Sequence, residues 1–225
     1  MTSCAWLFKW TRPNPEEGLE GRFSQEDKLR SEYSVQPQLS GRSRSAMSFH
    51  PPSQITVTSR QIPKWGGIPN TSLQSKPLMI YHKAFDASAS DLASHFEEVG
   101  EVMPQWVYSM YSQTHFHSTT HEVLGVVSGR ARLCFGGEGN PERLEPTVEK
   151  GDLIIVPAGV GHRLLDELDM DKERFKIVGA YPHRKQWDMC YGESKEEDKF
   201  SRNIHRLDWF HSDPLYGKDG PVMHV

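Results

Sequence analysis

The 225-residue sequence has few cysteines, no long apolar run and no strong excess of charge. Its three cysteines, Cys4, Cys134 and Cys190, are scattered and odd in number, which excludes a disulfide framework and a CxxC metal site. The longest apolar-leaning run, residues 153–161, contains Pro157 and is far shorter than the ~20 residues that cross a bilayer. We therefore expect a protein of a reducing compartment with no membrane-spanning segment.

Charge and the first residues of the chain narrow the class further. Lys and Arg total 26, and Asp and Glu total 30, for a net charge of −4 without a long basic block. Nucleic acid is therefore not an expected partner. The first residues lack the apolar centre of a secretory signal, and Glu16, Glu17 and Glu20 disfavour a mitochondrial transit peptide. We expect a cytoplasmic protein.

Two extensions flank the part of the chain that is expected to fold. Residues 1–60 are rich in serine and charged residues and poor in aliphatic ones, so they bury too little apolar surface to offset their chain entropy, and we predict a disordered arm. Because Met47 lies inside this arm, we expect residues 1–46 to be dispensable. Residues 191–225 form a tail whose aromatic residues, such as Trp209, are predicted to pack on the central domain.

Residues 61–190 are typical of an all-β domain that contains one short helix. Residues 77–81 are predicted to form a strand, and residues 86–98 a helix that ends at Gly100. The segments that follow are short, β-leaning and separated by turn residues, which favours an antiparallel sandwich or barrel. The later predicted strands are residues 106–111, 114–117, 123–127, 131–135, 152–156, 162–165 and 175–181.

The pair His115 and His117 is the first chemical signal. Residues i and i+2 of a strand share a face, so the two imidazoles can converge on one ion while Phe116 points into apolar packing. Tyr111 and Gln113 share that face if the strand is regular, either as hydrogen-bonding groups of a pocket or as polar residues of the wall. The pattern predicts a pair of metal ligands with a candidate pocket beside it.

Two later segments supply further candidate ligands. Glu122 begins an apolar strand after a polar turn, so a hairpin can return its carboxylate to the site of the two histidines. His121 is the alternative, because adjacent strand residues face opposite sides and only one of the two reaches a common ion. His162 follows a strand that is closed by a Pro/Gly turn, which holds this histidine rigidly.

These segments resemble the two motifs of the cupin superfamily. HFHSTTHEVLGVVSG is similar to the first motif and GDLIIVPAGVGH to the second, with every ligand position filled. Ser109 replaces the usual first Gly and Asp166 the usual last Asn, and both departures concern strand geometry more than metal binding. Segments across about residues 63–223 also resemble the small single-cupin proteins known as YjlB-like. This resemblance implies a single jelly-roll barrel and no particular substrate.

The resemblance also implies that His115, His117, Glu122 and His162 bind one divalent metal inside the barrel. The motif spacing favours Glu122 over His121 as the fourth ligand. Three imidazoles and one carboxylate suit Fe(II), Mn(II), Ni(II) or Co(II), with Zn(II) also possible. They leave positions on an octahedral ion for water, O₂ or a chelating substrate.

Three functions are compatible with such a site. The first is a metal-dependent enzyme, oxygenase-like or an isomerase or lyase, that acts on a small organic molecule. The second is a non-catalytic module that binds a small molecule or a metal. The third is a structural protein, which the intact ligand set disfavours. Exposed strand edges need covering, so a homodimer is expected. Tyr181 and His183, near the end of a late strand, either contact a metal ligand or a substrate or serve as packing or surface residues, and the second interpretation is preferred.

Overall fold

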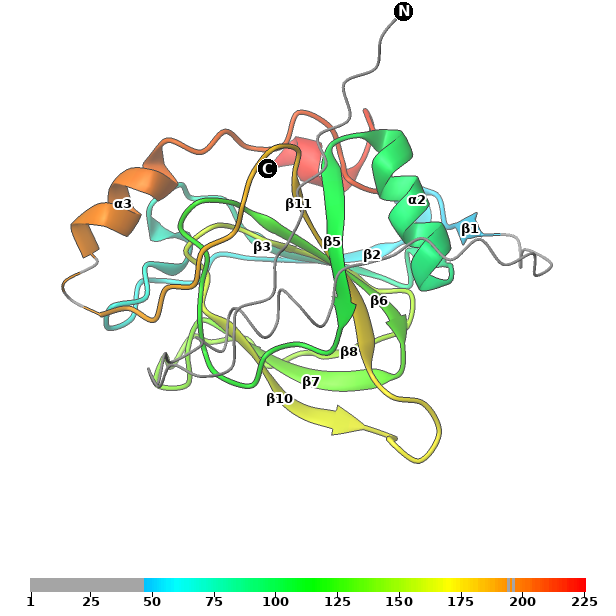
Figure 1. Ribbon diagram of the computed structural model, residues 1–225, viewed down its shortest axis with the longest axis horizontal. Coiled ribbons are helices and arrows are strands. Elements are labelled where there is room, and N and C mark those ends of the chain that lie inside the picture. Colours follow the sequence, from blue (N-terminus) through cyan, green and yellow to red (C-terminus); the bar gives the residue numbers. More distant parts are fainter. Residues whose placement is uncertain (1–46, 194, 196) are drawn as a thin grey trace, which may run out of the picture. The chain divides into compact units, whose positions relative to one another are not determined.

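Two large antiparallel sheets and a small two-stranded one, β1-β4, form the described part of the protein in the computed structural model, which describes residues 47–193, 195 and 197–225 (Figure 1). The larger sheet has the strand order β2-β3-β9-β6-β11-β5, and the smaller has the order β10-β7-β8. This fold is a jelly roll whose sheets are not closed into one continuous barrel, and the predicted all-β class is confirmed. The strands are β1 (Ser48–Phe49), β2 (Thr56–Arg60), β3 (Leu78–His82), β4 (Phe85–Asp86), β5 (Val102–Tyr108), β6 (Glu122–Ser128), β7 (Arg130–Phe135), β8 (Thr147–Glu149), β9 (Leu153–Val156), β10 (His162–Leu168) and β11 (Lys176–Pro182).

The interior between the two sheets is filled by alternate strand residues. On β6, Leu124 and Val126 point inward and belong to the same apolar cluster as Leu133 and Phe135 of β7. Glu122 has the same parity as Leu124, so its side chain lies on the interior face at the start of β6. The strand pattern therefore directs the Glu122 carboxylate into the interior.

The outer face of the larger sheet is covered by helix α2 (Ala89–Val99) and by C-terminal residues. Leu92 and Phe96 of α2 pack with Phe210 and Val222 on this face. The helix lies close to the sheet because Gly125 has no side chain there: a Cβ at this position would lie 2.3 Å from Leu92 Cδ2. Apolar cover on both faces explains why β6 is a nearly continuous hydrophobic run.

The predicted helix is confirmed, and its ends follow from local chemistry. The Ser88 side chain accepts a hydrogen bond from the Asp91 N–H and caps the start of α2. At the other end Gly100 adopts φ 78°, a left-handed conformation that glycine tolerates without steric cost, and the helix stops.

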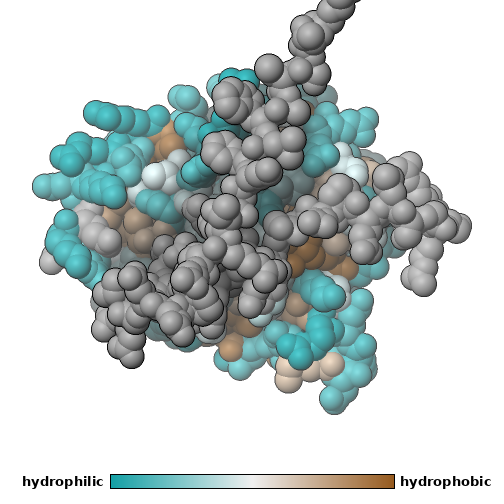
Figure 2. Space-filling model, viewed as in Figure 1, coloured by the Kyte–Doolittle hydropathy of each residue, from teal (hydrophilic) through white to brown (hydrophobic). Residues whose placement is uncertain are grey.

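The second helix, α3 (Glu197–His205), lies in the tail and packs through one face. Phe200 and Ile204 are buried in a cluster with Phe116. Hydrophilic residues dominate the left margin of Figure 2, where Figure 1 places α3. Among the described residues, no helix combines the length and apolar character needed to span a membrane. Short 3₁₀ turns occur at Pro52–Gln54, Asn70–Ser72 and Pro221–His224.

The structure corrects two of the predicted segments. The part of the predicted disordered arm at residues 1–46 lies outside the described residues, whereas residues 48–60 supply β1 and β2. These short strands are held by backbone pairing with β4 and β3, which composition does not reveal. Residues 114–117 do not form the expected regular strand, because His115 bridges β10 while Phe116 bridges Cys190 on another segment.

Candidate metal centre

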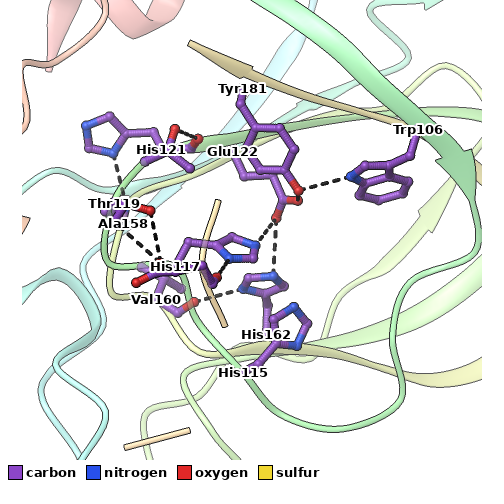
Figure 3. A network of polar contacts seen from close by, with 12 residues as sticks. Trp106, His115, His117, Thr119, His121, Glu122, Ala158, Val160, His162 and Tyr181 are labelled. Atoms are coloured by element: carbon purple, nitrogen blue, oxygen red, sulfur yellow. Dashed lines mark hydrogen bonds and ion pairs between the residues drawn. The ribbon is translucent and has the colours of Figure 1, made fainter. Parts of the chain in front are cut away.

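Three histidines and one glutamate meet inside the jelly roll. His115, His117 and His162 each offer a ring nitrogen within 4.8 Å of the others, and all three are buried. Glu122 Oε2 lies 3.2 Å from His162 Nε2 and 3.6 Å from His117 Nε2 (Figure 3). The structure thus brings together the four residues that the sequence motifs predicted as metal ligands.

These four residues come from three parts of the chain. Glu122 is the first residue of β6, in the larger sheet, and His162 is the first residue of β10, in the smaller sheet. His115 and His117 lie in the segment between β5 and β6. His115 is fixed to β10 by two backbone hydrogen bonds with His162, of 3.3 and 2.8 Å. His115 and His117 still share one direction without a regular strand, since Phe116 between them points away and packs with Phe200 and Ile204 of α3.

The second ring nitrogen of each histidine faces a backbone carbonyl. His115 Nδ1 lies 2.9 Å from the Gln113 oxygen, and His162 Nδ1 lies 2.9 Å from the Val160 oxygen. His117 Nδ1 pairs in the same way with the Asp188 oxygen. Because a carbonyl only accepts hydrogen bonds, each Nδ1 carries a proton, and Nε2 is the nitrogen of each ring that can bind a metal in the neutral imidazole. Metal-binding histidines are oriented by this arrangement.

The residues of the cluster differ in the direction in which their pKa values are shifted. Burial, together with the neighbouring His162 and His117, lowers the pKa of His115 to about 2, so this imidazole is neutral. Burial raises the pKa of Glu122, but His117 and His162 outweigh it and hold that pKa well below its usual range. Glu122 is therefore a buried anion. Burial lowers the pKa of His117, but the Glu122 charge outweighs it and the pKa is raised.

Two buried polar atoms of the cluster have no hydrogen-bond partner. Their lack of a partner shows whether these residues fit a metal. Glu122 Oε2 and His117 Nε2 are both enclosed and unsatisfied. A buried polar atom without a partner costs free energy, and an anion costs more. One cation bound by Nε2 of the histidines and by Oε2 would satisfy both atoms and balance the carboxylate. The cluster fits a divalent metal.

The other oxygen of Glu122 is held from the side opposite to the histidines. Tyr181 of β11 donates a 2.7 Å hydrogen bond to Glu122 Oε1, and Trp106 Nε1 donates to the Tyr181 oxygen at 3.0 Å (Figure 3). The preferred interpretation of Tyr181 as a packing or surface residue does not include this contact, which corresponds to the alternative left open for it. A signal was present in its parity, because Tyr181 shares a face of β11 with Ile177, which lies in the interior cluster.

Asp188 connects the loop after β11 to the histidine segment. Its carboxylate accepts hydrogen bonds from the Ser118 N–H and Oγ, both at 2.6 Å, and from the Thr119 N–H at 3.2 Å. Its backbone oxygen accepts from His117 Nδ1. Trp187 packs beside the His117 ring, with centroids 6.0 Å apart. Sequence patterns contain no signal for this role, because Asp188 lies about 70 residues from its partners.

His121 faces away from the cluster. Its Nδ1 accepts a 3.0 Å hydrogen bond from the Ala158 N–H, so Nε2 carries the proton and faces the Asp208 carbonyl oxygen at 3.2 Å. Its ring packs edge-on against Trp209. Of the two neighbours that competed in the sequence, the structure brings Glu122 to the three histidines and buries His121 elsewhere.

The two remaining pocket candidates differ in position. The Tyr111 ring lies edge-on to His115, with centroids 5.5 Å apart. The Gln113 side chain is exposed, and its backbone oxygen holds His115 instead. The expected common face does not form, because the segment that contains both residues is not a regular strand.

Comparison with known proteins agrees with this fold. The family model for the cupin domain matches residues 107–169, which include all four clustered residues. The uncharacterized protein YjlB of Bacillus subtilis is 31% identical over 163 residues, which cover 72% of this chain and 92% of YjlB. The cupin domain match and the 31% identity to YjlB together show the family. The chain belongs to the YjlB-like cupins.

Similar solved structures are more distant. RmlC from Streptococcus suis, solved with dTDP-D-xylose, is 14% identical, with 64% of this chain and 75% of RmlC covered and a TM-score of 0.31. Procruciferin, the 11S globulin of Brassica napus, is 16% identical, with 50% of this chain covered and a TM-score of 0.26. The chain spans 22% of that procruciferin. Likenesses this distant carry no argument about function.

Proposed function

We propose that the protein is a metal-dependent enzyme that acts on a small organic molecule. One divalent metal would be held by Nε2 of His115, His117 and His162 and by Glu122 Oε2. The proposal is carried by one observation: these donor atoms face one another in a buried site where Glu122 Oε2 lacks any other partner. The intact donor set favours a chemical role over a purely structural one.

The donor set favours certain metals. Three imidazoles and one carboxylate suit Fe(II), Mn(II), Ni(II) and Co(II), and Zn(II) fits less well because its structural sites are usually closed tetrahedra. Such an ion, when bound, supplies Lewis-acid polarisation of a substrate oxygen or, if it is redox-active, activation of O₂. An oxygenase-like reaction is the first candidate, and an isomerase or lyase reaction is the second.

The protein residues prepare the site before any ligand arrives. The carbonyls of Gln113, Val160 and Asp188 keep a proton on each Nδ1 and fix the ring orientations, so that Nε2 is the nitrogen directed at the site. Tyr181 keeps the Glu122 carboxylate in place through a buried hydrogen bond. Burial of the whole cluster excludes bulk water and strengthens the electrostatic interactions within it.

Metal content is the first test. Protein purified without chelators or an affinity tag is analysed by elemental mass spectrometry beside the double variant His115→Ala/His117→Ala. A matched control, His183→Ala/His205→Ala, removes two exposed histidines, and circular dichroism checks that each variant folds. We expect near-stoichiometric iron, manganese, nickel or cobalt in the parent and in the control, and none in the double variant.

Turnover is the second test. Metal-loaded protein is screened for O₂ uptake and for isomerisation or elimination of candidate small molecules. Turnover that disappears in the double variant supports the enzyme proposal. Saturable ligand binding without turnover indicates a non-catalytic binding module instead. Negligible metal in the parent, even after anaerobic loading, contradicts the proposal. The expected homodimer and the cytoplasmic location stay predictions.

A further inference from the structure

We propose that Tyr181 is a positioning residue that occupies one oxygen of Glu122, so that the carboxylate offers a single oxygen to the metal. This inference rests on the proposed function, because it concerns how the same site binds its ion. It adds a role for Tyr181, Trp106 and Gly179, which lie outside the set of four ligands.

The two oxygens of Glu122 have different surroundings. Oε1 accepts the 2.7 Å hydrogen bond from Tyr181 and faces away from the histidines. Oε2 faces His162 Nε2 and His117 Nε2 at 3.2 and 3.6 Å and has no hydrogen-bond partner. One oxygen is therefore engaged by the protein, and the other points at the atoms that would share the ion.

The direction of the Tyr181 hydrogen bond is fixed by Trp106. An indole N–H only donates, so the 3.0 Å contact from Trp106 Nε1 occupies a lone pair of the Tyr181 oxygen. The hydroxyl hydrogen is then directed to Glu122 Oε1, which as a carboxylate oxygen only accepts. Tyr181 is buried, so water does not compete for this hydrogen.

The fold makes room for this chain of contacts. Trp106 on β5 pairs with Gly179 on β11, two residues before Tyr181. A Cβ at Gly179 would lie 2.0 Å from Trp106 Cε2, so any larger residue would push the indole out of place. The indole thus lies over Gly179 and reaches the Tyr181 hydroxyl. Three residues that pack the interior also orient a ligand.

The consequence for the metal is a matter of coordination number. A carboxylate binds an ion through one oxygen or through both. If Glu122 used both oxygens, it would take a further position that a substrate needs. With Oε1 bonded to Tyr181, Glu122 contributes Oε2 alone, and that position stays available.

The test compares two buried tyrosines that make equivalent bonds. Tyr181→Phe removes the hydroxyl from Glu122. The matched control Tyr81→Phe removes the hydroxyl that bonds Asp213 at the same 2.7 Å distance, on the outer face of the same sheet. Each protein is loaded with Co(II), whose visible absorption spectrum reports coordination number, and the affinity is measured by competition with a chelator.

We expect Tyr181→Phe to change the Co(II) spectrum and to weaken Co(II) binding by about 10- to 100-fold, the loss typical of removing a partner of a metal ligand. Tyr81→Phe should keep the parent spectrum and affinity. Trp106→Phe should change the spectrum in the same direction by a smaller amount, because Tyr181 keeps its hydroxyl but loses its fixed direction. Trp106→Phe also serves as the test if Tyr181→Phe does not fold.

The outcomes separate this inference from the proposed function. A parent spectrum and affinity in Tyr181→Phe, with only the loss of thermal stability seen in Tyr81→Phe, means that Tyr181 has a packing role and overturns the inference alone. Parent behaviour in Trp106→Phe, where that variant carries the test, has the same meaning. If the parent protein itself binds no Co(II), both the inference and the proposed function fail.

Discussion

Two buried tyrosines, on opposite faces of the larger sheet, each donate a 2.7 Å hydrogen bond to a carboxylate. Tyr181 bonds Glu122 in the interior, and Tyr81 bonds Asp213 on the outer face. The two pairs are alike in burial and length, and in both cases burial and then the carboxylate charge raise the pKa of the phenol. Their carboxylates differ in what else they contact.

Asp213 is fully engaged by the tail that it organises. Its Oδ1 accepts from the Leu215 and Tyr216 N–H groups, and its Oδ2 accepts from the Tyr81 hydroxyl and the Val222 N–H. Glu122, in contrast, has one oxygen with no hydrogen-bond partner among three histidines. A buried carboxylate with every oxygen satisfied is typical of a structural element, whereas a half-satisfied one among imidazoles indicates a candidate binding site.

Removing Asp213 should produce the largest effect on stability. Asp213→Ala leaves three buried donors and one half-buried donor without their acceptor, so we expect the free energy of unfolding to fall by at least about 3 kcal/mol. Urea denaturation of metal-free protein measures this loss. Co(II) affinity of the folded fraction should stay unchanged. A stability loss under about 1 kcal/mol would erase the difference between the two carboxylates.

Replacing Glu122 should have the opposite pattern. Glu122→Gln removes the anionic ligand, and we expect Co(II) affinity to fall by about 100-fold or more, the upper end of losses seen even for partners of ligands. Stability of the metal-free protein should fall less than in Asp213→Asn, because Glu122 Oε2 has no hydrogen-bond partner to lose. Chelator competition and urea denaturation, with Asp213→Asn beside it, check both statements. Tight Co(II) binding by Glu122→Gln would contradict the assignment of Oε2 as a donor.

The neighbour of Glu122 extends the comparison to histidines. His121→Ala loses the hydrogen bond from the Ala158 N–H and the contact with the Asp208 carbonyl oxygen. We therefore expect the free energy of unfolding to fall by about 2 kcal/mol. Metal stoichiometry should equal that of the parent. Elemental analysis and thermal denaturation of the same sample test this. Loss of the metal in a folded His121→Ala protein would show that the buried histidine belongs to the site.

Asp188 should give the smallest effect of the four. Asp188→Asn keeps the backbone oxygen that orients His117 but weakens the carboxylate bonds to Ser118 and Thr119. We expect Co(II) affinity to fall by about 10-fold. Asp208→Asn is the control. Asp208 also faces a histidine, His121, through its backbone oxygen, and its side chain takes no part in that contact. Equal affinities in the two variants, measured by chelator competition, would remove Asp188 from the site.

Local patterns in the sequence predicted several strands and the four clustered residues. Short β-leaning runs bounded by turn residues predicted β6 and β9, because a strand buried on both faces is a short apolar segment between turns. The residue spacings of the two motifs predicted the four clustered residues, since His115 and His117 keep a common direction over one two-residue step. In these cases the determining interactions lie within a few residues of one another.

The contacts that decide the site are of another kind. Whether His121 or Glu122 faces the three histidines follows from the packing of the tail and of Ala158, and the role of Asp188 depends on a loop about 70 residues away. The sequence by itself determined the fold class and the candidate ligands, which depend on local periodicity and spacing. Only the tertiary structure decided which atom of each ligand is available, because hydrogen bonds from distant segments to the ring nitrogens and to Glu122 Oε1 select it.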